Sequence, residues 1–561
     1  MKPISSNMFK LTAISAMILS TTSASAALYQ VIEVKPQTTF AFESVYGVAI
    51  QPGNVVGGNS LGCFADGTTD CESSFKLAGE TRLVATHAGQ AIDGLSYREE
   101  APFGIDNGFI YVQDDERDFE RYCRTDLRYA ICETWADIRW NVWKKEINGV
   151  QTPNSIAFIE GQATPIDETK NVVVNSLTAN AEPIGITLTP GDVTGSRRNS
   201  VKALVANTSI NIDAGLQTRA WKTDGTYTVG SIAHEKTNNQ GNFYTSKGAI
   251  WDSLGTMTEI PWQTTNTERD NRLAQGSLRD VTVKDGNIYA VGYNTFYDDR
   301  NFMQASVSSV KVGESNWITK PVTGATVREN GTGGDFIHSH SLLTAVNEHG
   351  IAIGEAKLSR AESGAYANRL FVVPDIKDPK ANFLNGSLFF AGAGGKAGAI
   401  NNFNEIVGQI DTEETREVGG KPRRKRGFIY PYGTELQGSV PERQAIFNNR
   451  AWLLDDLTNG SEFSDNNQYR IIAANDINDA GVIAATALKC TGGYDSTAHN
   501  AQCGAGKGQE KTVAVKLVPI AGKTHKDISP RGMDDLVVER NGAGLGLWSL
   551  ILGGLLWFRR K

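Results

Sequence analysis

Proline and long amphipathic helical stretches are scarce in this chain of 561 residues. Only 17 prolines accompany 58 glycines, and few segments show the 3.6-residue apolar period of an amphipathic helix. This scarcity argues against a mainly helical fold. Abundant glycine with little proline is typical of many short strands joined by tight turns.

Familiar catalytic motifs are also missing. The sequence contains no H-E-x-x-H zinc-protease motif and no recognisable Ser/His/Asp block. The glycine-rich segment 391–397 has Ala397 where a phosphate-binding loop requires Ser or Thr. We therefore expect no cofactor. Carboxylates are plentiful, so a glycosidase pair stays open as an alternative.

The charge balance is acidic. The formal net charge at pH 7 is −7, and the two chain ends described below contribute basic residues to it, so the body between them is more acidic still. Binding a phosphate backbone requires clustered cations. We expect no nucleic-acid partner and no broad binding to anionic membranes.

Residues 1–26 have the layout of a secretory signal peptide. Lys2 and Lys10 precede a short apolar stretch, and Ala24-Ser25-Ala26 supplies a small-residue cleavage site. We predict cleavage by signal peptidase and a mature start near Ala27. A retained N-terminal anchor is the alternative.

Six cysteines lie in the mature region as three close pairs: Cys63 with Cys71, Cys123 with Cys132, and Cys490 with Cys503. Pairing by proximity is one of fifteen connectivities that six cysteines permit. A metal site is the alternative, but no C-x-x-C spacing occurs. We predict three local disulfides, which indicate an oxidising compartment.

An approximate repeat runs through residues 27–525. Each copy has an apolar pair, a polar turn rich in Asn, Asp and Gly, and an apolar run that ends in Gly or Ala. The copies cover 49–57, 105–112, 283–292, 346–354, 400–408 and 477–485, with a degenerate copy at 177–185. Such turns between β-branched residues predict β-hairpins. The terminal small residue indicates a close backbone approach.

Further strands with bulky centres lie between the copies, for example around Phe158, Trp221, Trp251, Phe371 and Phe428. A hairpin, such a strand and a closing strand make about four strands per unit. Units of this kind must stack on neighbours to bury their faces, and four-stranded units repeated radially form a β-propeller. We predict an all-β propeller of about seven blades (six to eight). A β-sandwich array is the alternative.

Residues 113–150 interrupt the repeat with charged and aromatic residues, among them Trp135, Trp140 and Trp143. Trp135, Ile138 and Val142 fit one helical face. A binding platform for carbohydrate or protein is one interpretation. A small helical insertion that packs its tryptophans on the propeller is the other, and we favour it.

Two segments resemble metal sites weakly. Asp335, His338 and His340 have a spacing that suits zinc on a strand, although no further ligands follow. Residues 476–487 resemble the start of a calcium loop, but alanines replace two oxygen ligands. The repeat turn explains this second segment better.

The basic segment 421–426 contains one lysine, a proline and then four consecutive basic residues. We expect a solvent-exposed loop and a protease target there. A specific anionic partner is the alternative.

The last twenty residues, 542–561, have the layout of a sorting tail after a linker at 526–541. Gly542, Gly544 and Gly546 lead into a short apolar transmembrane helix, and Arg559, Arg560 and Lys561 close the chain. The apolar run is shorter than the roughly 20 residues of a comfortable span. Its basic end would stay cytoplasmic and leave the body outside. An ordinary C-terminal anchor is the alternative.

This tail resembles the GlyGly-CTERM signals that a rhomboid-type protease removes in Gram-negative bacteria, although residues 541–544 depart from a strict Gly-Gly pair. The body resembles HAF-type extracellular repeats, most strongly over 245–490. Together they resemble an uncharacterised family of secreted gammaproteobacterial proteins. That resemblance implies a propeller-like fold and anchoring in the inner membrane, followed by processing to the cell surface or medium. It implies no activity.

The sequence therefore favours a non-enzymatic binding module. Candidate partners are a polysaccharide or an envelope protein. The alternatives are a polysaccharide hydrolase or lyase with carboxylates in the central cleft, and a purely structural surface component. Carboxylates with a histidine at the channel mouth would favour the enzyme, whereas exposed Trp or Tyr would favour the binder.

Overall fold

The computed structural model describes residues 27–37, 40–53, 58–84, 115–193, 199–205, 217–238, 241–269, 272–296, 301, 303–325, 340–358, 360–417 and 422–534. Everything below concerns these residues. The sorting tail and the signal peptide lie outside them. Within the described part of the chain, no helix is both long and apolar enough to cross a bilayer.

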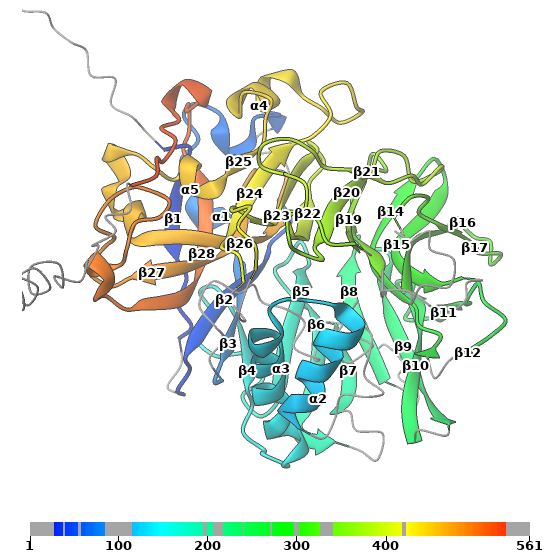
Figure 1. Ribbon diagram of the computed structural model, residues 1–561. Coiled ribbons are helices and arrows are strands. Elements are labelled where there is room, and N and C mark those ends of the chain that lie inside the picture. The colour runs from blue at the N-terminus through cyan, green and yellow to red at the C-terminus, as the bar shows by residue number, and fades with distance from the viewer. Residues whose placement is uncertain are drawn as a thin grey trace, which may run out of the picture.

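The protein is a seven-bladed β-propeller, as predicted (Figure 1). Blades 1 and 2 have three strands and the others four. In chain order the blades are β2 (Ser44–Ile50), β3 (Leu77–Arg82), β4 (Ser155–Ile159); β5 (Asn171–Leu177), β6 (Pro183–Val193), β7 (Asn199–Val205); β8 (Gln217–Thr223), β9 (Thr228–Asn238), β10 (Gly241–Trp251), β11 (Met257–Ile260); β14 (Ser277–Lys284), β15 (Asn287–Thr295), β16 (Met303–Lys311), β17 (Ile318–Pro321); β18 (Ser341–Val346), β19 (Ala352–Lys357), β20 (Asn368–Val373), β21 (Asn382–Phe383); β22 (Gly395–Ile400), β23 (Glu405–Asp411), β24 (Lys425–Pro431), β25 (Trp452–Leu453); and β26 (Tyr469–Ile477), β27 (Ile483–Cys490), β28 (Glu510–Pro519), β1 (Tyr29–Glu33).

Short elements complete the fold. They are the ribbon β12 (Glu268–Arg269) and β13 (Arg272–Leu273), the helices α1 (Cys71–Ser74), α2 (Glu116–Tyr122), α3 (Cys132–Ile147), α4 (Pro441–Ile446) and α5 (Leu454–Leu457), the 3-10 helices η2 (Gly62–Phe64), η6 (Ser461–Gln468), η7 (Gly504–Gly506) and η8 (His525–Asp527), and the π-helical segment η5 (Cys123–Leu127).

The first strand of each blade lines the centre of the ring. β2, β5, β8, β14, β18, β22 and β26 each contact the first strands of both neighbouring blades, so the ring is closed. Each first strand ends in the turn to the second strand. We call the face that carries these turns the near face and the opposite face the far face.

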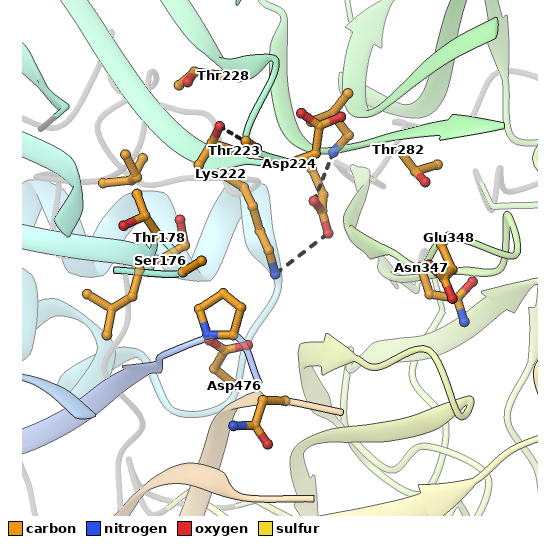
Figure 2. A pocket seen from close by; sticks show the side chains of 18 of the residues that line it. Ser176, Thr178, Lys222, Thr223, Asp224, Thr228, Thr282, Asn347, Glu348 and Asp476 are labelled. Atoms are coloured by element: carbon orange, nitrogen blue, oxygen red, sulfur yellow. Dashed lines mark hydrogen bonds and ion pairs between the residues drawn. The ribbon is translucent and has the colours of Figure 1, made fainter. Parts of the chain in front are cut away.

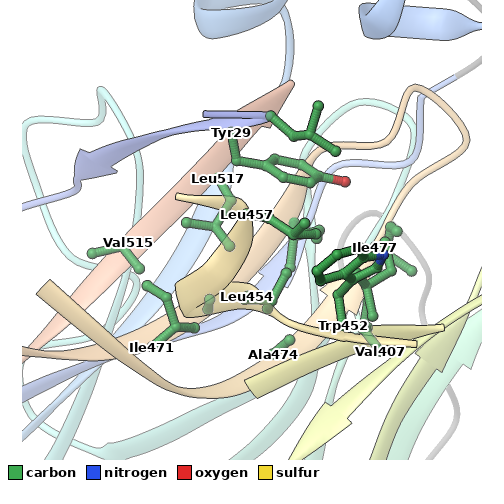
Figure 3. Close-up of a cluster of buried hydrophobic side chains, with 14 of the residues drawn as sticks. Tyr29, Val407, Trp452, Leu454, Leu457, Ile471, Ala474, Ile477, Val515 and Leu517 are labelled. Atoms are coloured by element: carbon green, nitrogen blue, oxygen red, sulfur yellow. The ribbon is translucent and has the colours of Figure 1, made fainter. Parts of the chain in front are cut away.

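Both ends of the chain build the last blade. β1 pairs antiparallel with β28, from Tyr29 opposite Pro519 to Glu33 opposite Val515. A buried apolar cluster joins them to blade 6 and α5, including Tyr29, Trp452 and Leu517 (Figure 3). Because β1 is separated from β28 by nearly the whole chain, this pairing holds the ring shut.

Glycines in the second strands let neighbouring backbones approach closely. A Cβ atom on Gly185, Gly230, Gly292, Gly354 or Gly408 would lie 1.8–2.5 Å from a carbonyl oxygen of the first strand of the same blade. Blade 7 has Ala485 at the equivalent position. The close approach predicted from the terminal Gly or Ala of the repeat is thus present.

Each first strand also contains a bulge at the same position. The pairing register shifts between residues 47 and 49, 174 and 176, 220 and 222, 278 and 280, 343 and 345, 397 and 399, and 474 and 476. A bulge bends a strand and redirects the side chains around it. The residue after the bulge is Ala49, Ser176, Lys222, Asp280, Ala345, Ala399 or Asp476.

Asparagines in the near-face turns explain the repeat motif. Asn347 donates from Nδ2 to the backbone oxygen of Asn401, Asn401 to that of Asn478, and Asn478 to that of Gln51. The Oδ1 atom of each asparagine accepts the N–H four residues later, which closes its own turn. The motif therefore links blades 5, 6, 7 and 1 in series.

One predicted repeat copy does not have the predicted form, and another is untested. β2 pairs with β3, which begins only at Leu77, so the copy at 49–57 is not a self-contained hairpin; the prediction was wrong because the turn is replaced by a longer excursion through η2 and α1. The copy at 105–112 lies outside the described residues.

The insertion is helical, as predicted, and crosses the far face. Ile138 and Val142 of α3 pack on blade 2, and the tryptophans cluster with Leu273, which lies before blade 4. The ammonium of Lys357, in blade 5, lies 4.1 Å from the ring centroid of Tyr129. The insertion emerges from blade 1, so it spans the far face from blade 1 to blade 5.

Three disulfides join the predicted pairs: Cys63–Cys71, Cys123–Cys132 and Cys490–Cys503. All six cysteines of the chain are therefore paired. Disulfides persist in oxidising compartments and are rare in the cytosol, so three of them indicate an extracytoplasmic protein.

The basic segment is not the exposed loop that we expected. Arg423 and Arg426 are only 4% and 7% exposed, and β24 begins at Lys425. Arg426 pairs with Asp455, and Lys425 with Asp411. The prediction was wrong because the acidic partners come from strand β23 and helix α5, which the local sequence does not reveal.

The close approach at the glycines generates a stability prediction. We expect Gly292→Ala to lower the free energy of unfolding by about 1–3 kcal/mol, the usual cost of overpacking, because its Cβ would lie 2.0 Å from the Ser277 oxygen. Chemical denaturation measures the change. Gly532→Ala, whose Cβ meets nothing within 4 Å, is the control and should stay within about 0.5 kcal/mol of the wild type. Equal stability of the two variants would contradict the packing described.

Candidate functional site: the central cavity

A cavity of about 710 Å³ lies where the seven first strands end. All seven blades contribute lining residues, through strand ends such as Ser176, Lys222 and Asp280 and through turns such as those at Asp224 and Asn347. The rim residues Asp224 and Thr226 are exposed on the near face. The lining consists of near-face strand ends and near-face turns, so the cavity opens toward the near face.

The lining is polar and strongly acidic. It contains seven carboxylate side chains and one cationic side chain, Lys222. The carboxylates belong to Glu182, Asp224, Asp252, Asp280, Glu348, Asp476 and Asp479. Low-dielectric walls lined by one sign of charge focus the electrostatic field and attract counter-ions. The cavity therefore favours neutral or cationic groups over anions.

Lys222 extends into this cavity between two aspartates. Its Nζ lies 3.9 Å from Oδ2 of Asp280, the ion pair marked by a dashed line in Figure 2, and Asp476 lies beyond its tip. Asp280, then Asp476, raise the pKa of Lys222, because their negative charges favour the ammonium form. The side chain keeps 32% of its surface accessible even though protein surrounds it, since that surface faces the cavity.

Asp280 and Asp476 bridge neighbouring blades in the same way. Oδ2 of Asp280 accepts the N–H of Val346 in blade 5 at 3.0 Å, and Oδ2 of Asp476 accepts the N–H of Ile50 in blade 1 at 3.0 Å. Their Oδ1 atoms accept the N–H of the next residue, Val281 or Ile477. Burial raises the pKa of both carboxyls, and Lys222 opposes that shift.

Carboxylates at the rim hold the near-face turns. Oδ1 of Asp224 accepts the N–H groups of Thr226 and Tyr227, and Oδ1 of Asp252 accepts those of Leu254 and Thr256. One oxygen of each carboxylate is committed to its turn. The negative charge of both side chains stays at the mouth.

The arrangement matches neither of the two signatures that we set for the channel mouth. The described lining residues include clustered carboxylates, but no histidine and no aromatic side chain. Asp280 and Asp476, the most central pair, each already hold two backbone N–H groups. These two carboxylates are positioned to support the ring and to contribute negative charge to the cavity.

The predicted binding tryptophans lie in the insertion and not at the cavity. Trp135 and Trp143 are 5% and 7% exposed, and Trp140 is half-buried against Phe119, 5.9 Å between ring centroids. Packing inside the insertion accounts for their positions.

Of the predicted zinc ligands, Asp335 and His338 lie outside the described residues. His340 is fully buried, and its Nδ1 accepts the N–H of Met303 at 3.0 Å. In the described part of the chain, no three His, Cys, Asp or Glu residues cluster as metal ligands.

Sequence reasoning missed Lys222 and Asp280. Asp476 was noted only for its likeness to a calcium loop. A partial signal was available: Asp280 and Asp476 stand just before the repeat copies at 283–292 and 477–485. Lys222 lies outside every copy, so the repeat could not have identified it. Segment 58–62 also matches the letters of a nucleophile elbow, but Ser60 lies in a loop before η2, where its carbonyl oxygen accepts from Arg443.

Lys222 provides a test of the charge arrangement. We expect Lys222→Met to lower the free energy of unfolding by about 1–2 kcal/mol at pH 7, between the values for surface and buried pairs. The folded-state pKa values of Asp280 and Asp476 are raised, and losing the cation raises them further. Both carboxyls therefore become neutral at higher pH in the folded variant than in the unfolded chain. The destabilisation should shrink as the pH falls through these raised values, because protonated carboxyls need no cation.

Denaturation at a series of pH values measures this dependence. Lys377→Met, which breaks an exposed pair with Asp285, is the control. Lys377 lowers the pKa of Asp285, so the effect of this variant should stay constant until the pH falls below the usual range of an aspartate. A constant effect of Lys222→Met across this range would contradict the charge arrangement.

Comparison with curated sequences and solved structures gives only distant likenesses. No curated protein sequence matches it. Solved structures that resemble it include a glycoside hydrolase, 8% identical over 59% of this chain and 92% of that chain, with a TM-score of 0.23. Another is a Synechocystis apocarotenoid oxygenase mutant, 9% identical over 72% of this chain and 90% of that chain, with a TM-score of 0.28. With TM-scores below 0.5, these likenesses carry no weight for function.

The family match is more extensive. Residues 206–561 match the family described as protein of unknown function (DUF3466). That span covers blades 3 to 6, three of the four strands of blade 7, and the residues from 520 to the end of the chain. The chain belongs to the DUF3466 family.

Proposed function

We propose that this protein is an exported binding module that takes up a basic segment of an envelope protein through the near-face mouth of its central cavity. The observation that carries the proposal is the charge of the lining, seven carboxylates against the single cation Lys222. A lysine or arginine side chain of a partner would meet complementary charge there.

Exposed apolar side chains beside the mouth support a protein ligand. Leu254 is 87% exposed, Val312 46% and Val283 43%. All three lie on near-face hairpins: Leu254 in blade 3, and Val283 and Val312 in blade 4. The hairpin that carries Leu254 also supplies Asp252 to the cavity. Apolar residues next to a charged pocket suit a peptide better than a sugar, because the lining offers no aromatic ring for stacking.

A polysaccharide hydrolase or lyase is less well supported. Each oxygen of Asp280 and Asp476 already accepts a backbone N–H. A general acid or nucleophile needs an oxygen free to approach the scissile bond. The described lining residues include no histidine, so an enzyme would have to use the other carboxylates of the lining.

The proposed location follows from both ends of the sequence. Signal peptidase would release the mature chain near Ala27, and the tail would hold it in the inner membrane until a rhomboid-type protease processed it for the cell surface or medium. The three disulfides support an oxidising compartment.

Binding of defined peptides tests the proposal. We expect the mature region to bind a Lys/Arg-rich peptide in isothermal titration and to bind an acidic peptide of the same length at least tenfold more weakly. Asp224→Asn with Asp252→Asn keeps the Oδ1 acceptors and removes two charges, so it should weaken binding about tenfold at low salt, a change of about 1.4 kcal/mol.

The matched control is Glu116→Gln with Glu133→Gln, which removes two exposed charges from the far-face insertion. It should leave the affinity unchanged. Equal effects of the two double variants would reduce the binding to non-specific charge attraction and overturn the assignment to the cavity. Release of new reducing ends from polysaccharides by the mature region would favour the enzyme instead.

A further inference from the structure

The chain leaves the propeller by a fixed route. After β28 ends at Pro519 on the near face, residues 520–534, which we call the C-terminal strap, cross the side of blade 7. The strap begins with Ile520, whose N–H donates to Leu28 O at 2.9 Å, and Gly522, whose N–H donates to Phe64 O at 2.9 Å. Residues 526–534, predicted as part of a linker, are therefore packed on the propeller.

The strap ends at the far face, where a buried arginine fixes it. Arg531 is 6% exposed; its Nε donates to Asp455 O at 2.6 Å, and its N–H donates to Asp456 Oδ1 at 2.8 Å. The N–H of His499 donates to Gly532 O. His499 belongs to the connection between β27 and β28, which lies on the far face.

The last described residue is held at the same place. The N–H of Asp534 donates to Asn500 Oδ1 at 2.7 Å, and Asn500 Nδ2 donates to Asp534 O at 2.8 Å. The path of the backbone is thus set by hydrogen bonds up to Asp534. The residues that follow start from the far face, the face opposite the cavity mouth.

The distance from this point to the apolar tail is short. Ten residues separate Asp534 from Leu545, where the apolar run begins. Ten residues span at most about 35 Å when fully extended. The first strands of about seven residues separate the two faces by about 25 Å. A coil of ten residues has an end-to-end distance of only about 16–19 Å, less than the separation of the two faces. A tail inserted in a bilayer therefore keeps the far face closer to the lipid, on average, than the near face.

We infer that the far face, with its helical insertion, is the surface that faces the lipid bilayer while the tail is membrane-bound, and that the cavity mouth points away from it. The insertion then lies between the channel and the lipid, and a ligand reaches the cavity from the side remote from the membrane. This orientation does not depend on what the cavity binds.

Energy transfer from single labelled sites to the bilayer tests the orientation. The six native cysteines are paired, so an introduced cysteine carries the donor. Glu133→Cys labels the far face and Glu435→Cys labels the near face; both side chains are exposed. The full-length chain is reconstituted in phosphatidylcholine vesicles that contain a headgroup-labelled acceptor lipid. We expect the transfer efficiency from position 133 to be at least twice that from position 435.

A matched variant shows whether the strap and the short linker cause the difference. Thirty Gly/Ser residues inserted after Asp534 add a flexible chain with an end-to-end distance of about 30 Å, which should bring the two efficiencies together. Equal or reversed efficiencies without the insertion would overturn the orientation, as would failure of the full-length chain to enter the vesicles.

Discussion

Hydrogen bonds from the end of one first strand to the start of the next turn hold this propeller together. Asp280 and Asp476 each accept an N–H of the following blade. Asn347, Asn401 and Asn478 donate in series to the following turns. A blade cannot bury both faces alone, so apolar packing brings blades together, but these directional bonds fix how each blade meets its neighbour. An unpaired buried donor or acceptor costs about 1–3 kcal/mol, which makes slipped arrangements unfavourable.

The side chains that make these hydrogen bonds also determine the charge of the cavity. Charged side chains follow the bulge in blades 3, 4 and 7, whereas alanine or serine follows it in the others. Lys222 thus meets Asp280 and Asp476 in the space that the small residues leave open. Asp280 and Asp476 support the ring and also contribute to the charge of the cavity, so neither can be replaced by an apolar residue without weakening the contacts between blades. Closure by the insertion on the far face leaves the acidic mouth as the accessible surface.

The sequence revealed the fold better than the site. Turn residues such as Asn401 and Asn478, and glycines such as Gly408, act within a hairpin or at a fixed position of each repeat, so their pattern is readable along the chain. Lys222 lies 58 residues before Asp280 of blade 4, and Asp476 comes from blade 7, across the ring. Only closure of the ring brings these three side chains together. The prediction for the basic segment near Arg423 failed for a similar reason: its acidic partners, Asp411 in β23 and Asp455 in α5, are brought to it only by the fold. The excursion through η2 and α1 replaces one predicted turn, because β3 starts far along the chain from β2.

The central claim is that side chains of one blade hold the backbone of the next around a closed ring. Hydrogen exchange measured by mass spectrometry tests it most directly at Ile50, whose N–H donates to Asp476 across 426 positions of sequence. If the ring is closed as described, peptides containing Ile50 and Val346 exchange as slowly as the buried strand β27. Exchange at either site as fast as that of the exposed turn at Gly313 would contradict the account.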